Sequence, residues 1–514
     1  MRRDMGRAAS SEKQAALPAP GMTSSSHSNM LEEPPKRDNI TADTMNIQTP
    51  CPVLAITPRL CRAAVVALLL VFQALPGWAA KPTYYSVGAA SVDITPDYPV
   101  RLCGYGVRQN ESEGIDQHIF AQALAIGTDK EGPALVLVVD NIIVPAYLRD
   151  DLAARLAKKT RVRNDHLTVC CTHTHCAPML KDVCTCLYGA DIPAEHQEHI
   201  NRYTRELADK LEQVALAALK NRKPATLSRG QTTVGFAWNR RPQSGPVDHD
   251  LPVLVARDKS GKIVAIWTSY ACHCTSIGDR PNHICGDWAG FAREYLQRDN
   301  PGTVALVSIG CGGDSDPQRR GGIEAAKENG NEISTAIKAL LQQPLQPLSG
   351  KLECRAKQIM MPYDKLPTRE EWNERAASPD HWVAYHAKKY LAKLDRGEKI
   401  PIALPFLVQT RSFGDQLAMI FLAGEPVADF ALRFRKEYDA SRLWVSAYAN
   451  DVPTYVPSKR IWDEGGYEAA AFIYADHPAR FSEATEALVV AAVHELVPRQ
   501  FAASPSHSSA SSVK

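Results

Sequence analysis

The sequence has little of several features that would assign it to a special class of protein. Its 514 residues carry a formal net charge of only +2, which gives no electrostatic reason to expect a nucleic-acid partner. No internal repeat recurs along the chain, and no apolar run after residue 80 is long enough to span a bilayer. The composition, 45% hydrophobic and 23% charged, is ordinary for a soluble protein, and the length allows a large core.

The thirteen cysteines lack the spacing of a four-cysteine zinc site. The two Cys-x-Cys pairs, at residues 184/186 and 272/274, are not followed by partners at metal-ligand spacing. Two cysteines fall in the first 80 residues, which leaves eleven, so at least one thiol stays free or pairs between molecules. We expect most of them to be buried small side chains or, in an exported protein, disulfides.

The first 80 residues have the features of a targeting segment. Residues 1–44 are polar and rich in Ser and Pro, so they are predicted to be disordered or to precede the true start. Residues 45–80 combine arginines, an apolar run and small residues that would suit a cleavage site. This pattern predicts a signal peptide and a periplasmic or secreted protein. An uncleaved membrane anchor stays open as the alternative, although the run is at the short end for a spanning helix.

Residues 81–500 have the pattern of an α/β fold. Apolar runs of strand length at residues 134–139 and 167–171 flank a leucine repeat of helical spacing between residues 147 and 159. We therefore predict one large catalytic domain with mixed β-sheets flanked by helices. Ligands in such folds tend to bind at the carboxyl ends of the strands.

A change in composition marks residues 344–405. Charged segments of helical character at Thr368–Glu374 and His381–Asp395 predict a helical insertion or lid, with a peripheral helical pair as the alternative. The Ser-rich residues 501–514 are predicted to be a disordered tail.

Histidines and acidic residues follow several of the apolar runs. Because side chains two apart share a face of a strand, His173 and His175 are expected to project together after residues 167–171, as the start of a metal or acid/base site. His273 and Glu425 end other apolar runs. A catalytic zinc site of this type needs neutral imidazoles and an anionic oxygen, with one position open for water. Spacing alone does not join these residues, and each also has a purely structural interpretation, such as a carboxylate at a helix N-terminus.

Eight short motifs in the chain follow one another in a recognisable order. They are Gly88-Ala-Ala-Ser-Val-Asp-Ile-Thr95, Gly104-Tyr-Gly106, Thr172-His-Thr-His-Cys-Ala-Pro178, Asn239-Arg240, His273-Cys-Thr-Ser276, Gly424-Glu425, Asn450 with Tyr455, and Gly466-Tyr-Glu468. This series resembles the catalytic domain of the neutral (alkaline, non-lysosomal) ceramidases over residues 87–468, nearly all of the part expected to fold.

The resemblance implies a zinc site and an amide-hydrolysing reaction. The implied zinc ligands are His173, His273, Glu425 and Tyr455. The implied groups that act on the substrate are His175, beside the metal, and Arg240 and Tyr467, at the substrate carbonyl. The implied reaction is hydrolysis of ceramide or a similar lipid amide by zinc-activated water. The implied partner is therefore a small-molecule or lipid amide substrate, and peripheral contact with a membrane stays open.

Two departures from the family pattern affect these expectations. Asp316 stands where family members carry the serine of Gly-Asp-Val-Ser-Pro-Asn, so we expect zinc-activated water rather than a serine nucleophile. Longer members carry a C-terminal β-sandwich, whereas only one helix and a tail are expected after Glu468, so the ceramide inference rests on analogy. The alternatives are a hydrolase of another N-acyl or ester substrate and a non-catalytic exported binding protein.

Overall fold

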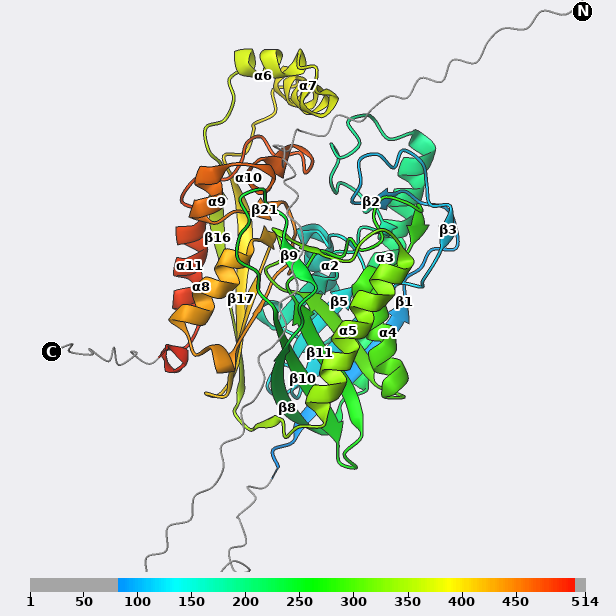
Figure 1. The fold of residues 1–514 in the computed structure, drawn as a ribbon, viewed down its shortest axis with the longest axis vertical. Helices are drawn as coiled ribbons and strands as arrows, with labels where there is room; N and C mark the ends of the chain where they lie inside the picture. Colours follow the sequence, from blue (N-terminus) through cyan, green and yellow to red (C-terminus); the bar gives the residue numbers. More distant parts are fainter. Residues whose placement is uncertain (1–81, 504–514) are drawn as a thin grey trace, which may run out of the picture. The chain divides into compact units, whose positions relative to one another are not determined.

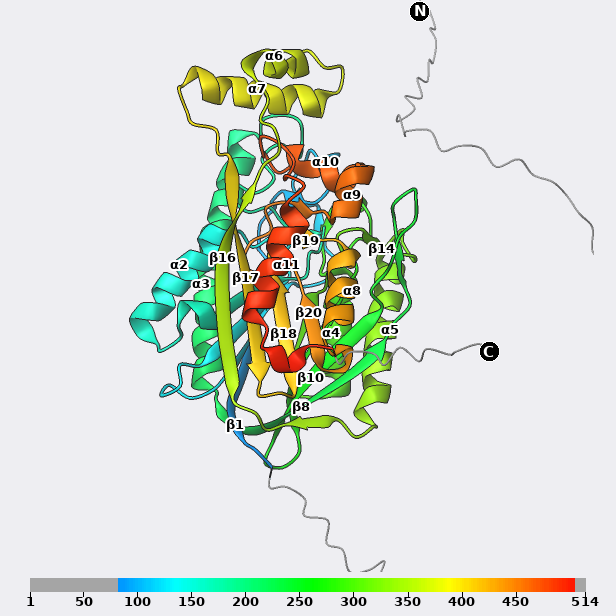
Figure 2. The same cartoon turned by 90° about the vertical axis from the view of Figure 1, so that its left-hand side faces the viewer.

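The computed structural model describes residues 82–503, which are arranged as two packed sheets with helices on their outer faces (Figures 1 and 2). The predicted segments 1–44 and 45–80, and nearly all of the predicted tail 501–514, lie outside the described residues. Between residues 82 and 503 no helix has the length and apolar character needed to cross a membrane.

The larger sheet has nine strands and mixed direction. Its order is β13–β11–β10–β8–β1–β4–β5–β6, with β15 also paired to β8. The pairs β5–β6 and β11–β13 are parallel, and the other neighbours are antiparallel. The strands are β1 (Tyr85–Asp93), β4 (Phe120–Ile126), β5 (Ala134–Val139), β6 (Leu167–Cys171), β8 (Lys223–Thr233), β10 (Asp250–Asp258), β11 (Ile263–Tyr270), β13 (Val304–Ile309) and β15 (Gln346–Leu348).

The smaller sheet has four strands in the order β16–β17–β18–β20, with β18 and β20 parallel. Its strands are β16 (Leu352–Pro362), β17 (Ala403–Phe413), β18 (Leu417–Leu422) and β20 (Leu443–Ser446). Helices α3 (Ala194–Lys220), α4 (Asp287–Asp299) and α5 (Ile323–Leu341) cover the larger sheet, and α2 (Ala146–Lys159) packs on α3. Helices α8 (Ala428–Glu437) and α11 (Thr485–Leu496) cover the smaller one.

Strand β5 shows why the central strands are continuous apolar runs in the sequence. Leu135, Leu137 and Val139 belong to the core that includes the helices over the larger sheet, whereas Val136 and Val138 face the core between the two sheets. Both faces of the strand are therefore buried, so its sequence does not alternate between polar and apolar residues. The core between the sheets is centred on aromatic rings, with Trp267 stacked on Phe421 at 5.8 Å.

The predicted fold class, an α/β domain with mixed sheets flanked by helices, is confirmed. The predicted helices of the 344–405 segment form as α6 (Arg369–Ala376) and α7 (His381–Asp395). The helical insertion is narrower than that range, because β16 and the start of β17 also lie within it. In Figure 2, α6 and α7 stand at the far end of the long β16–β17 hairpin.

The eleven cysteines between residues 82 and 503 are all free thiols, and nine of them are buried. Of the two expectations for these residues, the described structure therefore shows buried small side chains rather than disulfides.

Candidate metal and active site

Strands from both sheets deliver the predicted site residues to one place. His173 follows β6 of the larger sheet, and His273 follows β11 of the same sheet. The chain after β20 of the smaller sheet pairs with β6, since the Asn450 amide donates to the Val169 carbonyl and the Cys171 amide donates to the Tyr448 carbonyl. These hydrogen bonds place the segment that follows β20 beside the carboxyl end of β6.

Glu425 and Tyr455 enter the site as a matched pair. They are directly opposite each other in a short parallel ladder between β19 (Glu425–Pro426) and β21 (Tyr455–Val456). The close approach of Gly313 supports this ladder, because a Cβ atom at that glycine would lie only 2.5 Å from the Glu425 carbonyl oxygen. The backbone therefore fixes where both side chains begin.

The tautomers of the three histidines follow from their backbone partners. The Nδ1 atom lies 2.8 Å from the Ile142 carbonyl in His173, 2.8 Å from the Gly312 carbonyl in His273 and 3.2 Å from the Gly104 carbonyl in His175. A carbonyl oxygen only accepts, so each Nδ1 carries the proton and donates. Each neutral imidazole then presents a bare Nε2 lone pair.

The bare nitrogens converge on one another and on two oxygens. The Nε2 atoms of His173 and His175 are 3.3 Å apart. Oε2 of Glu425 lies 3.2 Å from Nε2 of His173 and 3.3 Å from Nε2 of His273, and it is buried without a hydrogen-bond donor. The Tyr455 hydroxyl oxygen is 3.1 Å from Nε2 of His273. Lone pairs that face one another in a buried site repel unless a cation lies between them. The site therefore fits a bound cation, and this set of nitrogen and oxygen ligands suits zinc.

The electrostatics of the site are consistent with neutral imidazoles around an anionic carboxylate. Burial, reinforced by the neighbouring His173 and His273, lowers the pKa of His175 well below its usual value. Burial also lowers the pKa of His273. Burial alone would raise the pKa of Glu425, but the adjacent His173 and His273 hold it well below its ordinary value. A metal that binds here therefore has few protons to displace from His175, His273 and Glu425.

The distances alone do not show which of the three histidines would bind the metal and which would transfer a proton. The ligand atoms of His173, His175 and His273 all lie within 4.8 Å of one another. His175 is thus as close to the cluster as the residues expected to bind zinc, and its division from them stays a prediction.

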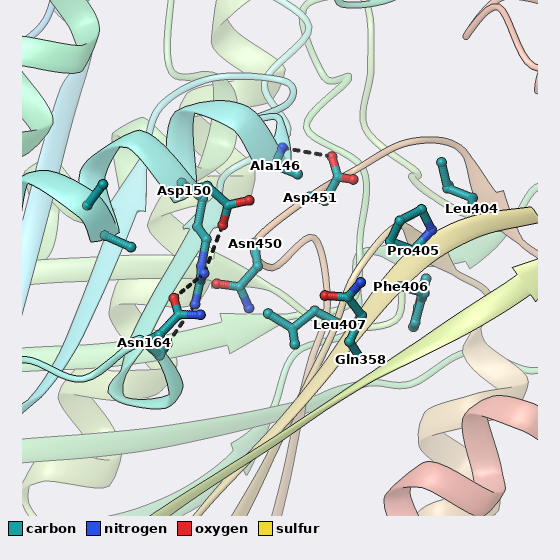
Figure 3. A pocket seen from close by; sticks show the side chains of 13 residues that line it. Ala146, Asp150, Asn164, Gln358, Leu404, Pro405, Phe406, Leu407, Asn450 and Asp451 are labelled. Atoms are coloured by element: carbon teal, nitrogen blue, oxygen red, sulfur yellow. Dashed lines mark hydrogen bonds and ion pairs between the residues drawn. The ribbon is translucent and has the colours of Figure 1, made fainter.

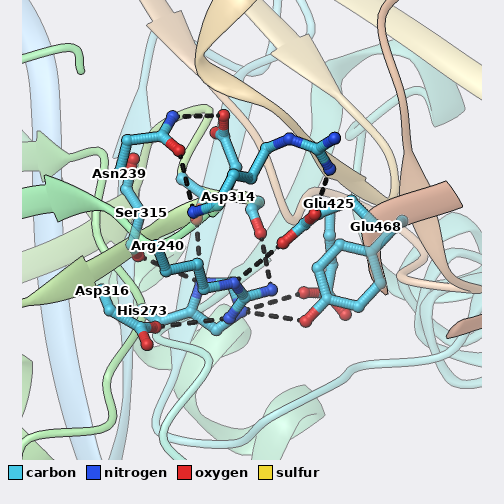
Figure 4. A network of polar contacts seen from close by, with 12 residues as sticks. Asn239, Arg240, His273, Asp314, Ser315, Asp316, Glu425 and Glu468 are labelled. Atoms are coloured by element: carbon cyan, nitrogen blue, oxygen red, sulfur yellow. Dashed lines mark hydrogen bonds and ion pairs between the residues drawn. The ribbon is translucent and has the colours of Figure 1, made fainter. Parts of the chain in front are cut away.

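Arg240 lies behind the cluster rather than on the cavity wall. Its guanidinium is 5.4 Å from the Tyr455 ring centre and 5.2 Å from that of Tyr467. Its Nε donates to Glu468 at 2.9 Å, Nη1 donates to Asp316 at 3.3 Å and Nη2 donates to the Gly313 carbonyl at 2.9 Å (Figure 4). Three sides of the guanidinium are therefore fixed, and the remaining N–H groups are available to the tyrosines or a substrate.

Sequence patterns did not identify the carboxylates that hold Arg240. Glu468 is buried and also accepts from Nη1 of Arg241 at 2.6 Å, so one carboxylate bridges two arginines. Asp316 accepts from Arg320 as well, at 2.6 Å. The signal was present in part, since Glu468 ends the Gly-Tyr-Glu motif and Asp316 replaces a family serine, but only the fold shows that both carboxylates meet Arg240.

A cavity of about 60 Å³ opens at the cluster. Of the seven predicted site residues, five line it and two, Arg240 and His273, lie behind the wall. The lining residues are Gly104, Ile142, Ile143, His173, His175, Cys184, Leu187, Glu425, Pro453, Thr454, Tyr455, Tyr467, Ala471, Tyr474 and Ala475. Most of the non-polar wall comes from loops without a motif, which sequence analysis could not assign.

A larger cavity, of about 700 Å³, lies between α2 and β17 (Figure 3). Its lining includes Asn450 and Asp451, which precede Tyr455, but none of the seven predicted site residues. There the Asp451 carboxylate accepts a hydrogen bond from the Ala146 amide at 3.1 Å, at the start of α2. Asp451 thus ties this helix to the loop that leads to Tyr455.

Comparison with known proteins finds a family match for residues 85–335. The model of the N-terminal region of neutral/alkaline non-lysosomal ceramidases matches residues 85–335. Residues 85–335, just under half of the chain, therefore carry the N-terminal region of this ceramidase family. Neutral ceramidase A of Dictyostelium discoideum is 26% identical over 269 residues, which are 46% of this chain and 36% of that protein. The neutral ceramidase of Drosophila melanogaster is 24% identical over 249 residues, 44% of this chain and 35% of that protein.

These matches span only about a third of the length of the curated relatives. Among solved structures, a ceramidase complexed with C2 superposes with a TM-score of 0.63 at 17% identity, covering 82% of this chain and 77% of that one. The neutral ceramidase from Pseudomonas aeruginosa gives 0.62 at 19% identity, with 82% and 76% covered. These two likenesses show the family's fold, and they extend well beyond residue 335, where Glu425, Tyr455 and Tyr467 lie.

Proposed function

We propose that this chain is a zinc-dependent hydrolase of N-acyl amide bonds, with ceramide or a similar lipid amide as its substrate. The observation that carries the proposal is the convergence of the His173 and His273 Nε2 lone pairs on the partnerless Glu425 Oε2. The match of residues 85–335 to the ceramidase family supports the choice of an amide bond. The proposal extends to an exported protein, because the signal peptide predicted in residues 45–80 fits an enzyme that meets lipids outside the cytoplasm.

In this proposal four residues hold the zinc: His173, His273, Glu425 and Tyr455. Bound zinc would lower the pKa of a water molecule and polarise the scissile carbonyl. The buried backbone carbonyls of Ile142 and Gly312 orient the two histidines through their Nδ1 protons. Such outer partners typically change metal affinity or activity by about 10–100-fold when they are lost.

The remaining site residues act on the substrate. Tyr467, which lines the cavity, offers its hydroxyl to the carbonyl oxygen, and the fixed positive charge of Arg240 lies 5.2 Å from the Tyr467 ring. A well-placed donor of this kind contributes roughly 3–4 kcal/mol to the transition state. His175, whose Nε2 faces the cluster, is proposed to carry the proton that the departing amine needs.

The test is a zinc determination combined with a substrate panel. The purified chain should contain about one zinc per molecule, and a chelator should remove both zinc and hydrolysis. The panel contains ceramides, N-acyl amino acids, N-acyl amino sugars and matched esters, and ceramide should be cleaved fastest. Cleavage of a different panel member would favour the alternative N-acyl or ester hydrolase. A chain that binds no zinc and cleaves nothing would favour a binding protein and end the proposal.

A further inference from the structure

Helix α7 fixes the position of one wall of the cavity. Two loops form that wall: residues 183–191, which contribute Cys184 and Leu187, and residues 471–477, which contribute Ala471, Tyr474 and Ala475. We call them the wall loops. They contact each other through a hydrogen bond from the Thr185 hydroxyl to Asp476, 3.2 Å long.

The helix contacts the first wall loop along its length. The indole N–H of Trp382 donates to the Leu187 carbonyl at 2.8 Å, and the Tyr385 hydroxyl donates to Asp191 at 2.7 Å. The loop and the helix pack closely at Gly189, where an added Cβ would lie 2.6 Å from the His381 ring. This loop therefore cannot move outward while α7 stays in place.

The same helix holds the second wall loop. Lys389 and Lys393 both pair with the Asp476 carboxylate, at 3.3 and 3.1 Å. The Tyr390 hydroxyl donates to the Asp476 carbonyl at 2.7 Å. The Trp382 ring also meets the Tyr474 ring edge-on, with 6.3 Å between centres. One helix thus fastens both loops from outside, and its only covalent links to the sheet are the two arms of the β16–β17 hairpin.

The size of the cavity limits what can enter it. Pockets that enclose a drug-sized ligand measure roughly 300–1,000 Å³, whereas this cavity measures about 60 Å³. In the same measure one water molecule needs about 10–15 Å³, so the cavity holds a group of only a few heavy atoms. Its non-polar lining, from Ile142, Ile143, Leu187 and Pro453, suits a short hydrocarbon chain. Tyr467, which is 52% exposed, marks the side that is open to solvent.

We propose that α7 makes this chain selective for N-acyl amides with short acyl chains, of roughly two to four carbons. The acyl group occupies the closed end against the wall loops, and the amine portion leaves on the open side at Tyr467. This inference rests on the proposed amide hydrolysis and deepens it, because it assigns the acyl-length limit to residues outside the zinc cluster.

The experiment compares kcat/KM of the zinc-loaded full chain for four N-acyl sphingosines, with acetyl, hexanoyl, dodecanoyl and octadecanoyl groups in one detergent. The native chain should prefer the acetyl over the octadecanoyl compound by about tenfold or more. Trp382→Ala removes one contact of α7 with each wall loop and should reduce that preference at least about fivefold, chiefly by lowering KM for the long substrates. Lys389→Ala, which leaves the core of α7 intact, should act in the same direction more weakly.

Arg369→Ala is the matched control, because its partner Asp395 lies within the α6–α7 pair and both side chains are exposed. It should leave the chain-length profile unchanged. Cleavage of the octadecanoyl compound as fast as the acetyl compound by the native chain would overturn the inference while leaving amide hydrolysis standing. An unchanged profile in both α7 variants, with zinc content and far-UV spectrum retained, would overturn it too. If none of the four amides is cleaved, the proposed ceramide hydrolysis fails, and the inference fails with it.

Discussion

The Nε2 atoms of His173 and His175 lie 3.3 Å apart, and neither carries a proton, because both imidazoles donate from Nδ1 to a backbone carbonyl. Strand periodicity predicted that these residues would project together, and they do, but for another reason. Strand β6 ends at Cys171, and His173 has a left-handed backbone with φ of 55°. Strain at such a position is typical of functional sites.

Replacing each histidine by alanine should separate their roles. We expect His173→Ala to lose zinc and activity together, because it removes a nitrogen that faces Glu425. We expect His175→Ala to keep zinc and to lose roughly 10²–10⁴-fold in kcat, the range for a lost general acid or base. Zinc content and turnover are measured on the same samples. Loss of zinc in His175→Ala would instead place His175 among the ligands.

Glu468→Gln should weaken catalysis without touching the zinc ligands. The carboxylate is buried and bridges Arg240 and Arg241, so an amide leaves one of the arginines poorly paired beside Tyr467. We expect kcat/KM to fall about 10–100-fold, as for other residues that orient a site, with zinc content unchanged. Glu464→Gln is the control, since Glu464 also pairs with Arg241 but is more exposed. Equal losses in the two variants would show that Arg241, and not Arg240, matters.

Asp451 should make stability depend on pH. Burial raises its pKa from 3.8 to about 6, so the folded chain binds this proton more tightly than the unfolded chain does. Its contribution is present below about pH 4 and is lost as the pH rises through 6. Asp451→Asn should therefore be more stable at pH 7.5, by up to about 3 kcal/mol, and nearly equal to the native chain at pH 4.

The measurement for Asp451 is the denaturation midpoint from pH 4 to 8. Asp150→Asn serves as control, because that neighbouring carboxylate is 67% exposed and should alter stability by less than about 0.5 kcal/mol. Parallel curves for native chain and Asp451→Asn would contradict the raised pKa.

Trp267→Ala tests the packing of the two sheets. The ring is buried, stacks on Phe421 and lies 4.8 Å from the Trp444 ring. We expect a loss of about 3–5 kcal/mol in unfolding free energy from the cavity left behind, measured by denaturant titration. Trp238→Ala, at a site 43% exposed, should change it by less than about 0.5 kcal/mol. A similar cost at both positions would argue against the packed interface.

Local sequence patterns determined much of this protein. The apolar run Ala134–Val139 and the amphipathic stretch His381–Asp395 form a strand and a helix with those bounds. A continuous apolar run is the local signal of a strand buried on both faces, and Asp380 caps the start of the helix. The motif order also placed seven residues in one site, and the fold brings them together although they are up to 294 positions apart in sequence, from His173 to Tyr467.

Only the tertiary structure decided how that site is held and enclosed. The bare state of each Nε2 depends on which carbonyl faces Nδ1, and Ile142, Gly312 and Gly104 come from loops with no periodic signal. Arg240 is held by Asp316 and Glu468, which lie 76 and 228 positions away from it in the sequence. The closure of the cavity by α7 depends on an insertion that meets two distant loops. The sequence by itself determined which chemical groups are available, because residue type sets donors and charge. The orientation of these groups, their hydrogen-bond partners and the size of the cavity were decided by packing between distant segments, which no local pattern encodes.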